Sequence, residues 1–151
     1  MPLNPVLVAV DGSDTSLDAA RAGLALLADD APVVIVTVVE TSDPTLVTGS
    51  GMAGGVMSAE ELDVLDEDRV AEGEATLAAA VAGLGRGNAD ALVVRGDPGG
   101  ALCDLARERD ASAIVMGSRG RGGIKRALLG SVSDYVVRNA HCPVIITRPQ
   151  E

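Results

Sequence analysis

Hydrophobic residues in this chain form short continuous runs, separated by segments in which apolar positions recur every three to four residues. The first pattern is typical of strands buried on both faces, and the second is typical of amphipathic helices. The predicted strands are Val6–Val10, Val33–Val39, Ala91–Val94, Ser112–Met116 and Pro143–Thr147. The predicted helices are Ser16–Ala28, Ala59–Leu84, Gly100–Arg109 and Ser131–Asn139. This alternation predicts an α/β fold around a mainly parallel sheet of five strands.

The segment 41–58 interrupts the alternation. It contains four glycines and shows no hydrophobic period. Because connections of this length are usually either functional or disordered, we predict a flexible loop here. The length of 151 residues otherwise fits a single domain covering 1–151.

The composition predicts a folded, acidic protein with an aliphatic core. Hydrophobic residues make up 47% of the chain and the mean hydropathy is +0.28, which disfavours disorder of the whole chain. The chain has no Phe or Trp and one Tyr, so Val, Leu, Ile and Ala must fill the core. Its net charge of −10 argues against binding to nucleic acid, because phosphate backbones require a basic surface.

Cysteine spacing and the N-terminal sequence bear on the cellular compartment. Cys103 and Cys142 match no metal-binding or redox spacing, and we predict two free thiols. The N-terminal residues lack the basic region and long apolar run of a signal peptide, and no apolar stretch reaches the roughly 20 residues of a membrane span. We therefore expect a cytoplasmic protein that does not associate with a membrane.

The first half of the long predicted helix is strongly acidic. Its acidic residues are Glu60, Glu61, Asp63, Asp66, Glu67, Asp68, Glu72 and Glu74. The early ones suit a helix N-terminus, where the helix dipole favours negative charge. We interpret the cluster as a solvated helix face rather than as a metal site.

The segment Met116–Ser133 carries the strongest functional signal. It follows an apolar run and contains five glycines and four cationic side chains, and it ends in hydroxyl residues where a helix should begin. A ligand that carries phosphate needs close backbone N–H groups, nearby positive charge and a helix N-terminus. This segment provides all three, so we predict a phosphate-binding loop.

Two well-known phosphate motifs do not fit this loop. No GK[ST] follows a suitably spaced glycine, so it is not a Walker A motif, and Lys125 breaks the dinucleotide pattern G-x-G-x-x-G. A second candidate segment, Asp11-Gly12-Ser13, follows the first predicted strand. If the first and fourth strands are adjacent, both segments face one crevice at the carboxyl end of the sheet.

Gly117, Gly120, Gly130 and Ser131 form the spacing G-x2-G-x9-G-S. With this spacing, with the opening VAVDGSDTS and with the tail from Ile114 to Arg148, the chain resembles the nucleotide-binding branch of the universal stress protein family. The resemblance covers essentially the whole chain. It implies a Rossmann-like α/β fold with a five-stranded parallel sheet of order 3-2-1-4-5, helices on both faces and ATP between the first and fourth strands.

The resemblance also implies specific contacts. Near the nucleoside it implies Ala9, Asp11, Val38 through its backbone, Met116 and Gly117. Around the phosphates it implies Arg119, Gly120, Gly130, Ser131, Val132 and Ser133. It further implies a homodimer built through the edge strand Pro143–Arg148. The residues themselves leave two alternatives open for Asp11, which could cap the first helix or hold a divalent metal.

We therefore expect an ATP-binding protein with a regulatory or stress-response role. The ligand would be ATP, with or without Mg²⁺ or Mn²⁺, or another adenine nucleotide, and the regulatory partner is not indicated. One alternative is an enzyme that slowly hydrolyses ATP or transfers a nucleotidyl group in the same crevice, although no residue can be assigned as catalytic. The other is a nucleotide-free dimeric interaction module.

Overall fold

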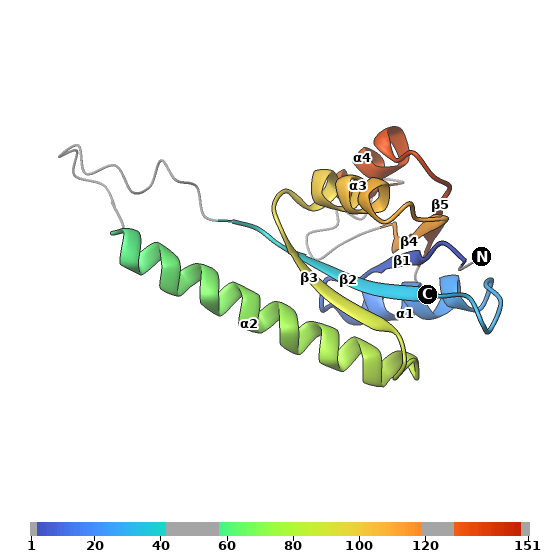
Figure 1. Ribbon diagram of the computed structural model, residues 1–151, viewed down its shortest axis with the longest axis horizontal. Helices are drawn as coiled ribbons and strands as arrows, with labels where there is room; N and C mark the ends of the chain where they lie inside the picture. Colours follow the sequence, from blue (N-terminus) through green and yellow to red (C-terminus); the bar gives the residue numbers. More distant parts are fainter. Residues whose placement is uncertain (1–2, 42–57, 119–128, 149–151) are drawn as a thin grey trace.

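The computed structural model describes residues 3–41, 58–118 and 129–148. The strands are β1 Val6–Ala9, β2 Val33–Val39, β3 Asp90–Arg95, β4 Ala113–Gly117 and β5 Val144–Thr147. The helices are α1 Asp14–Leu24, α2 Ala59–Leu84, α3 Pro98–Glu108 and α4 Ser131–Asn139. All strand pairs are parallel, and the sheet has the order β3-β2-β1-β4-β5 (Figure 1). The predicted fold class and strand order are confirmed.

The helices cover both faces of the sheet, as predicted. On one face, α1 and α2 pack over a cluster that includes Val8, Ile35 and Val115. On the other face, α3 and α4 pack over a cluster that includes Leu7 and Ile114. These five strand residues are fully buried, as expected for central parallel strands covered on both sides.

The predicted bounds of the first and third helices are wrong, by one to four residues at each end. The first helix ends at Leu24 rather than Ala28, and the following residues form turns that return the chain to β2. The third helix begins at Pro98 rather than Gly100, because the Asp97 side chain accepts a hydrogen bond from the backbone N–H of Gly100 and caps the helix. Proline is well suited to the first helical position, since no intrahelical hydrogen bond is required there.

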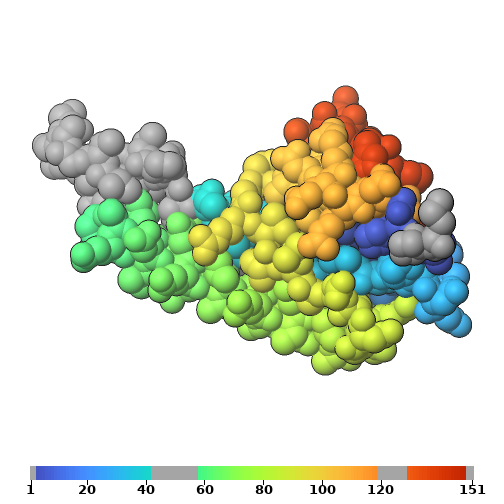
Figure 2. Space-filling model, in the orientation of Figure 1, coloured from blue at the N-terminus to red at the C-terminus, as the bar shows by residue number. Residues whose placement is uncertain are grey.

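Helix α2 has the predicted bounds, Ala59–Leu84, and clear signals at both ends. Ser58 and Glu61 form a capping box at its start, and Gly85 ends it with a left-handed φ of 67°. Its first turns extend beyond the sheet (Figures 1 and 2). The acidic residues of this half are mostly exposed, and the described part of the chain contains no group of three metal-ligating side chains.

The single tyrosine joins α4 to α3. A Cβ atom added at Gly99 would lie 2.6 Å from Cδ1 of Tyr135, so the tyrosine ring lies directly against the backbone of α3. The outer side of Tyr135 remains exposed. This close contact uses the absence of a side chain at Gly99.

Two predictions concern features outside the sheet. The predicted flexible loop 41–58 lies almost wholly outside the described residues. Among the helices that the structure describes, none is long and apolar enough to cross a membrane.

Candidate functional site

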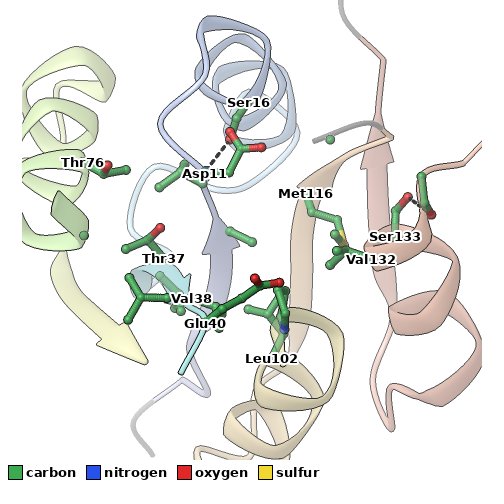
Figure 3. Close-up of a pocket in the computed structure, with 18 of the residues that line it drawn as sticks. Asp11, Ser16, Thr37, Val38, Glu40, Thr76, Leu102, Met116, Val132 and Ser133 are labelled. Carbon is green, nitrogen blue, oxygen red and sulfur yellow. Dashed lines mark hydrogen bonds between the residues drawn. The ribbon is translucent and has the colours of Figure 1, made fainter. Parts of the chain in front are cut away.

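A cavity of about 870 Å³ opens at the carboxyl ends of β1, β2 and β4, between α2 on one side and α3 and α4 on the other (Figure 3). This is the edge at which open parallel sheets bind ligands. Nine of the eleven residues predicted to contact a nucleotide line it: Ala9, Asp11, Val38, Met116, Gly117, Gly130, Ser131, Val132 and Ser133. The other two, Arg119 and Gly120, lie outside the described residues.

The Asp11 side chain supports the turn between β1 and α1. Its Oδ1 accepts hydrogen bonds from the Ser13 backbone N–H at 2.9 Å and from the Ser13 hydroxyl at 2.6 Å. Ser13 in turn caps α1 by accepting a hydrogen bond from the backbone N–H of Ser16. Asp11 therefore stabilises the helix start through Ser13. Its second carboxylate oxygen accepts no hydrogen bond from any described residue and remains available to a ligand.

The start of α4 provides an anion-binding geometry. Helices α1, α2 and α3 each begin with a side-chain cap, whereas α4 begins at Gly130 without one. No described residue accepts a hydrogen bond from the backbone N–H groups of Ser131 and Val132, which line the cavity. Unpaired N–H groups and the positive end of the helix dipole together favour a bound anion.

Hydrogen bonds join the start of α4 to the end of β4. The Gly130 N–H donates to the Ser118 carbonyl at 2.7 Å. The Ser133 hydroxyl lies within donating distance of two carbonyls, that of Ser118 at 3.0 Å and that of Gly130 at 3.1 Å. Its proton is therefore used inside the protein, and Ser131 has the exposed hydroxyl of this turn.

The carboxyl end of β2 provides a backbone donor and acceptor next to the cavity. Strand β1 pairs with β2 as far as Val36, whose carbonyl accepts the Val10 N–H at 2.9 Å. In a parallel ladder, alternate residues direct their N–H and C=O groups to the same neighbour. The N–H and C=O of Val38 therefore point to the side of β1, beyond the last described pairing with that strand.

The centre of the cavity is apolar. Leu102 of α3 and Met116 of β4 are buried, and Val132 of α4 is partly buried beside them. An apolar wall between a polar edge and a helix N-terminus is suited to a flat ring that carries a charged group.

Sequence reasoning missed the wall formed by α2, which comprises Arg69, Glu72, Gly73, Ala75 and Thr76. It also missed Thr37 of β2 and, from α3, Pro98 and Leu102. The helical spacing of the α2 residues was an available signal, because positions three and four apart lie on one face.

Arg69 joins α2 to the end of β2 at the rim of the cavity. Its Nη1 donates to the Glu40 carbonyl at 3.1 Å and lies 3.7 Å from Oδ1 of Asp66. The guanidinium thus fixes the segment that follows Val38.

Comparison with known proteins places this architecture in a family. The model for the universal stress protein family matches residues 2–148. The chain belongs to the universal stress protein family. Universal stress protein YxiE of Bacillus subtilis is 33% identical, with 96% of this chain and 99% of YxiE covered.

Solved structures of universal stress proteins share the fold. A universal stress protein in complex with cAMP is 26% identical, with a TM-score of 0.63 over 99% of this chain and 100% of that protein. A universal stress protein from Archaeoglobus fulgidus in complex with dAMP is 25% identical, with a TM-score of 0.58 over 97% of this chain and 98% of that protein.

Proposed function

We propose that this universal stress protein binds an adenine nucleotide in the cavity, with ATP as the expected ligand, and that the bound nucleotide regulates a partner in the cytoplasm. One observation carries the proposal. One cavity has the backbone N–H and C=O of Val38, which pair with no described strand on the side of β1, at one end and the start of α4, which has no side-chain cap, at the other. A base with donor and acceptor atoms matches the first, and phosphate matches the second.

Two solved relatives support the choice of adenine nucleotides, because their structures contain cAMP and dAMP. The neutral donor and acceptor of Val38 complement N1 and the exocyclic amine of adenine. The Asp11 carboxylate oxygen that accepts no hydrogen bond from a described residue is suited to ribose hydroxyls. Arg119 and Gly120 remain predicted phosphate contacts, together with Gly130, Ser131, Val132 and Ser133, and Gly117 remains a predicted contact near the nucleoside.

We also infer a homodimer through Pro143–Arg148. Strand β5 lies at one edge of the sheet, and each of its residues is partly exposed. An unpaired strand edge presents N–H and C=O groups that a second copy can cover.

The decisive experiment measures binding of ATP and AMP by calorimetry, together with mass spectrometry of any nucleotide released from the purified protein by denaturation. We expect one adenine nucleotide per chain. The informative variant is Gly130→Asp, because φ of −73° and ψ of 169° admit any residue and Asp is a favoured helix cap. The new carboxylate would fill the anion position and repel phosphate, so we expect affinity to fall at least about tenfold without loss of thermal stability.

Gly87→Asp is the matched control. Nothing lies within 4 Å of a Cβ added at Gly87, which does not line the cavity among the described residues, so this change adds the same charge at a distance. Equal nucleotide affinity in Gly130→Asp and Gly87→Asp would show that α4 does not bind phosphate. Absence of binding by the unmodified protein would leave the nucleotide-free interaction module. Steady phosphate release from ATP would instead favour the enzyme.

A further inference from the structure

Thr37 is a buried polar residue that neither the sequence motif nor the proposed contacts involve. It lies in β2 with 4% of its surface exposed, and it lines the cavity. Within the described residues its hydroxyl makes no hydrogen bond, whereas the buried Ser16 and Ser133 hydroxyls both do. A buried hydroxyl without a partner is unfavourable, so each such group requires an explanation.

The position of Thr37 in the strand directs its side chain towards α2. Residues of β2 alternate between the two faces of the sheet, and Ile35 packs in the cluster beneath α1 and α2. Thr37 lies two residues further along and shares this face. Figure 3 shows its hydroxyl in the space between Asp11 and Thr76, and the Thr76 hydroxyl also has no hydrogen bond to a described residue.

Helix α2 lies close to the sheet beside this space. A Cβ at Gly73 would come within 2.9 Å of Cγ1 of Val39 and within 3.2 Å of Cγ1 of Val93, so glycine allows the close approach. Gly73 and Ala75 add no polar side-chain atom to this part of the cavity wall. The Thr37 hydroxyl is therefore a buried donor that faces the cavity and has no hydrogen-bond partner among the described residues.

We propose that the Thr37 hydroxyl donates a hydrogen bond to a ring nitrogen of the bound adenine base and thereby contributes to base specificity. This inference rests on the proposed nucleotide-binding function. Val38 immediately follows Thr37 and is assigned to N1 and the exocyclic amine, while Asp11 is assigned to the ribose. The acceptors of the base that remain are N3 and N7, and both lie between these two edges. A hydroxyl on the wall between Val38 and Asp11 can reach an atom of this kind.

Thr37→Val tests the inference because valine keeps the branched shape and removes only the hydroxyl. We expect the affinity for AMP to fall about fivefold, the effect of one hydrogen bond of about 1 kcal/mol. The melting temperature of the ligand-free variant should be equal or higher, since no protein hydrogen bond is lost. Ser112→Ala is the control: the Ser112 hydroxyl donates to the Asn4 carbonyl at 3.0 Å and does not line the cavity among the described residues. That variant should lose stability and keep its affinity.

Calorimetry with AMP, 3-deaza-AMP and 7-deaza-AMP identifies the nitrogen. The analogue that lacks the bonded nitrogen should bind the unmodified protein about fivefold more weakly than AMP and should lose nothing further in Thr37→Val. Unchanged AMP affinity in Thr37→Val overturns the inference, as does an equal loss for all three nucleotides. If the unmodified protein binds neither ATP nor AMP, the proposed function fails, and this inference fails with it.

Discussion

Replacing Asp11 separates its structural contribution from its predicted contact with a ligand. Alanine removes both hydrogen bonds that Oδ1 accepts from Ser13, at 2.9 and 2.6 Å. Asparagine keeps an oxygen that can accept them and removes the charge. Asp11→Asn should therefore preserve the turn and weaken nucleotide binding, whereas Asp11→Ala should weaken both the turn and the binding.

The size of the structural effect follows from these two bonds. Hydrogen bonds to a charged acceptor are stronger than neutral ones, but Asp11 is only partly buried and water replaces part of the loss. We expect Asp11→Ala to lower the free energy of unfolding by about 1–2 kcal/mol. For a chain of this size, this corresponds to a fall of about 3–6 °C in melting temperature.

Urea denaturation of the nucleotide-free protein measures this difference. Asp14→Ala is the matched control, because Asp14 is the exposed first residue of α1 and its side chain has no hydrogen bond to a described residue. Losing its interaction with the helix dipole should cost only about 0.5 kcal/mol. If Asp11→Ala and Asp14→Ala are equally stable, the hydrogen bonds of Asp11 to Ser13 contribute nothing, and the reasoning is refuted.

Two further predictions concern packing and thiol chemistry. Gly23→Ala places a Cβ 2.2 Å from Cγ1 of Val115, so we expect this variant to lose about 1–3 kcal/mol of unfolding free energy in urea denaturation. Gly100→Ala is the control, because its Cβ meets only an ordinary contact at 3.4 Å and should cost no stability. Equal stability of the two variants would contradict this prediction. Burial raises the pKa of both Cys103 and Cys142, so less thiolate is present at pH 8 than in a free cysteine. Both thiols should therefore react with a thiol reagent more slowly than free cysteine, and the rate should rise above pH 9. A reaction as fast as that of free cysteine would contradict the burial of the thiols.

Local patterns were sufficient to predict the sheet. A half-exposed strand would alternate apolar and polar residues, whereas Val33–Val39 is apolar at nearly every position. The structure buries both faces of this strand over most of its length. The start of α2 was equally readable, because Ser58 and Glu61 carry the capping box in their spacing. The first helix was predicted too long because Leu27 continues the apolar period, and it packs on the core from a turn instead.

Sequence alone could predict only those cavity residues that lie at strand ends or in the glycine motif. Asp11, Gly117 and Gly130 could be placed in this way. Thr37 and Thr76 could not, because their position in one cavity depends on how closely α2 approaches β2, and that distance is set by tertiary packing at Gly73. The helix period shows which α2 residues share a face but not what the face contacts.

The scarcity of aromatic residues has a spectroscopic consequence. With no tryptophan and Tyr135 as its single tyrosine, the protein has almost no near-ultraviolet absorbance of its own. An adenine base carried through purification would dominate the spectrum of the folded protein. Tyr135 also lies in α4, against Gly99 of α3, so its fluorescence is an intrinsic probe of the helix proposed to bind phosphate. Nucleotide binding could therefore be followed without any label, through the absorbance of the adenine base and the fluorescence of Tyr135.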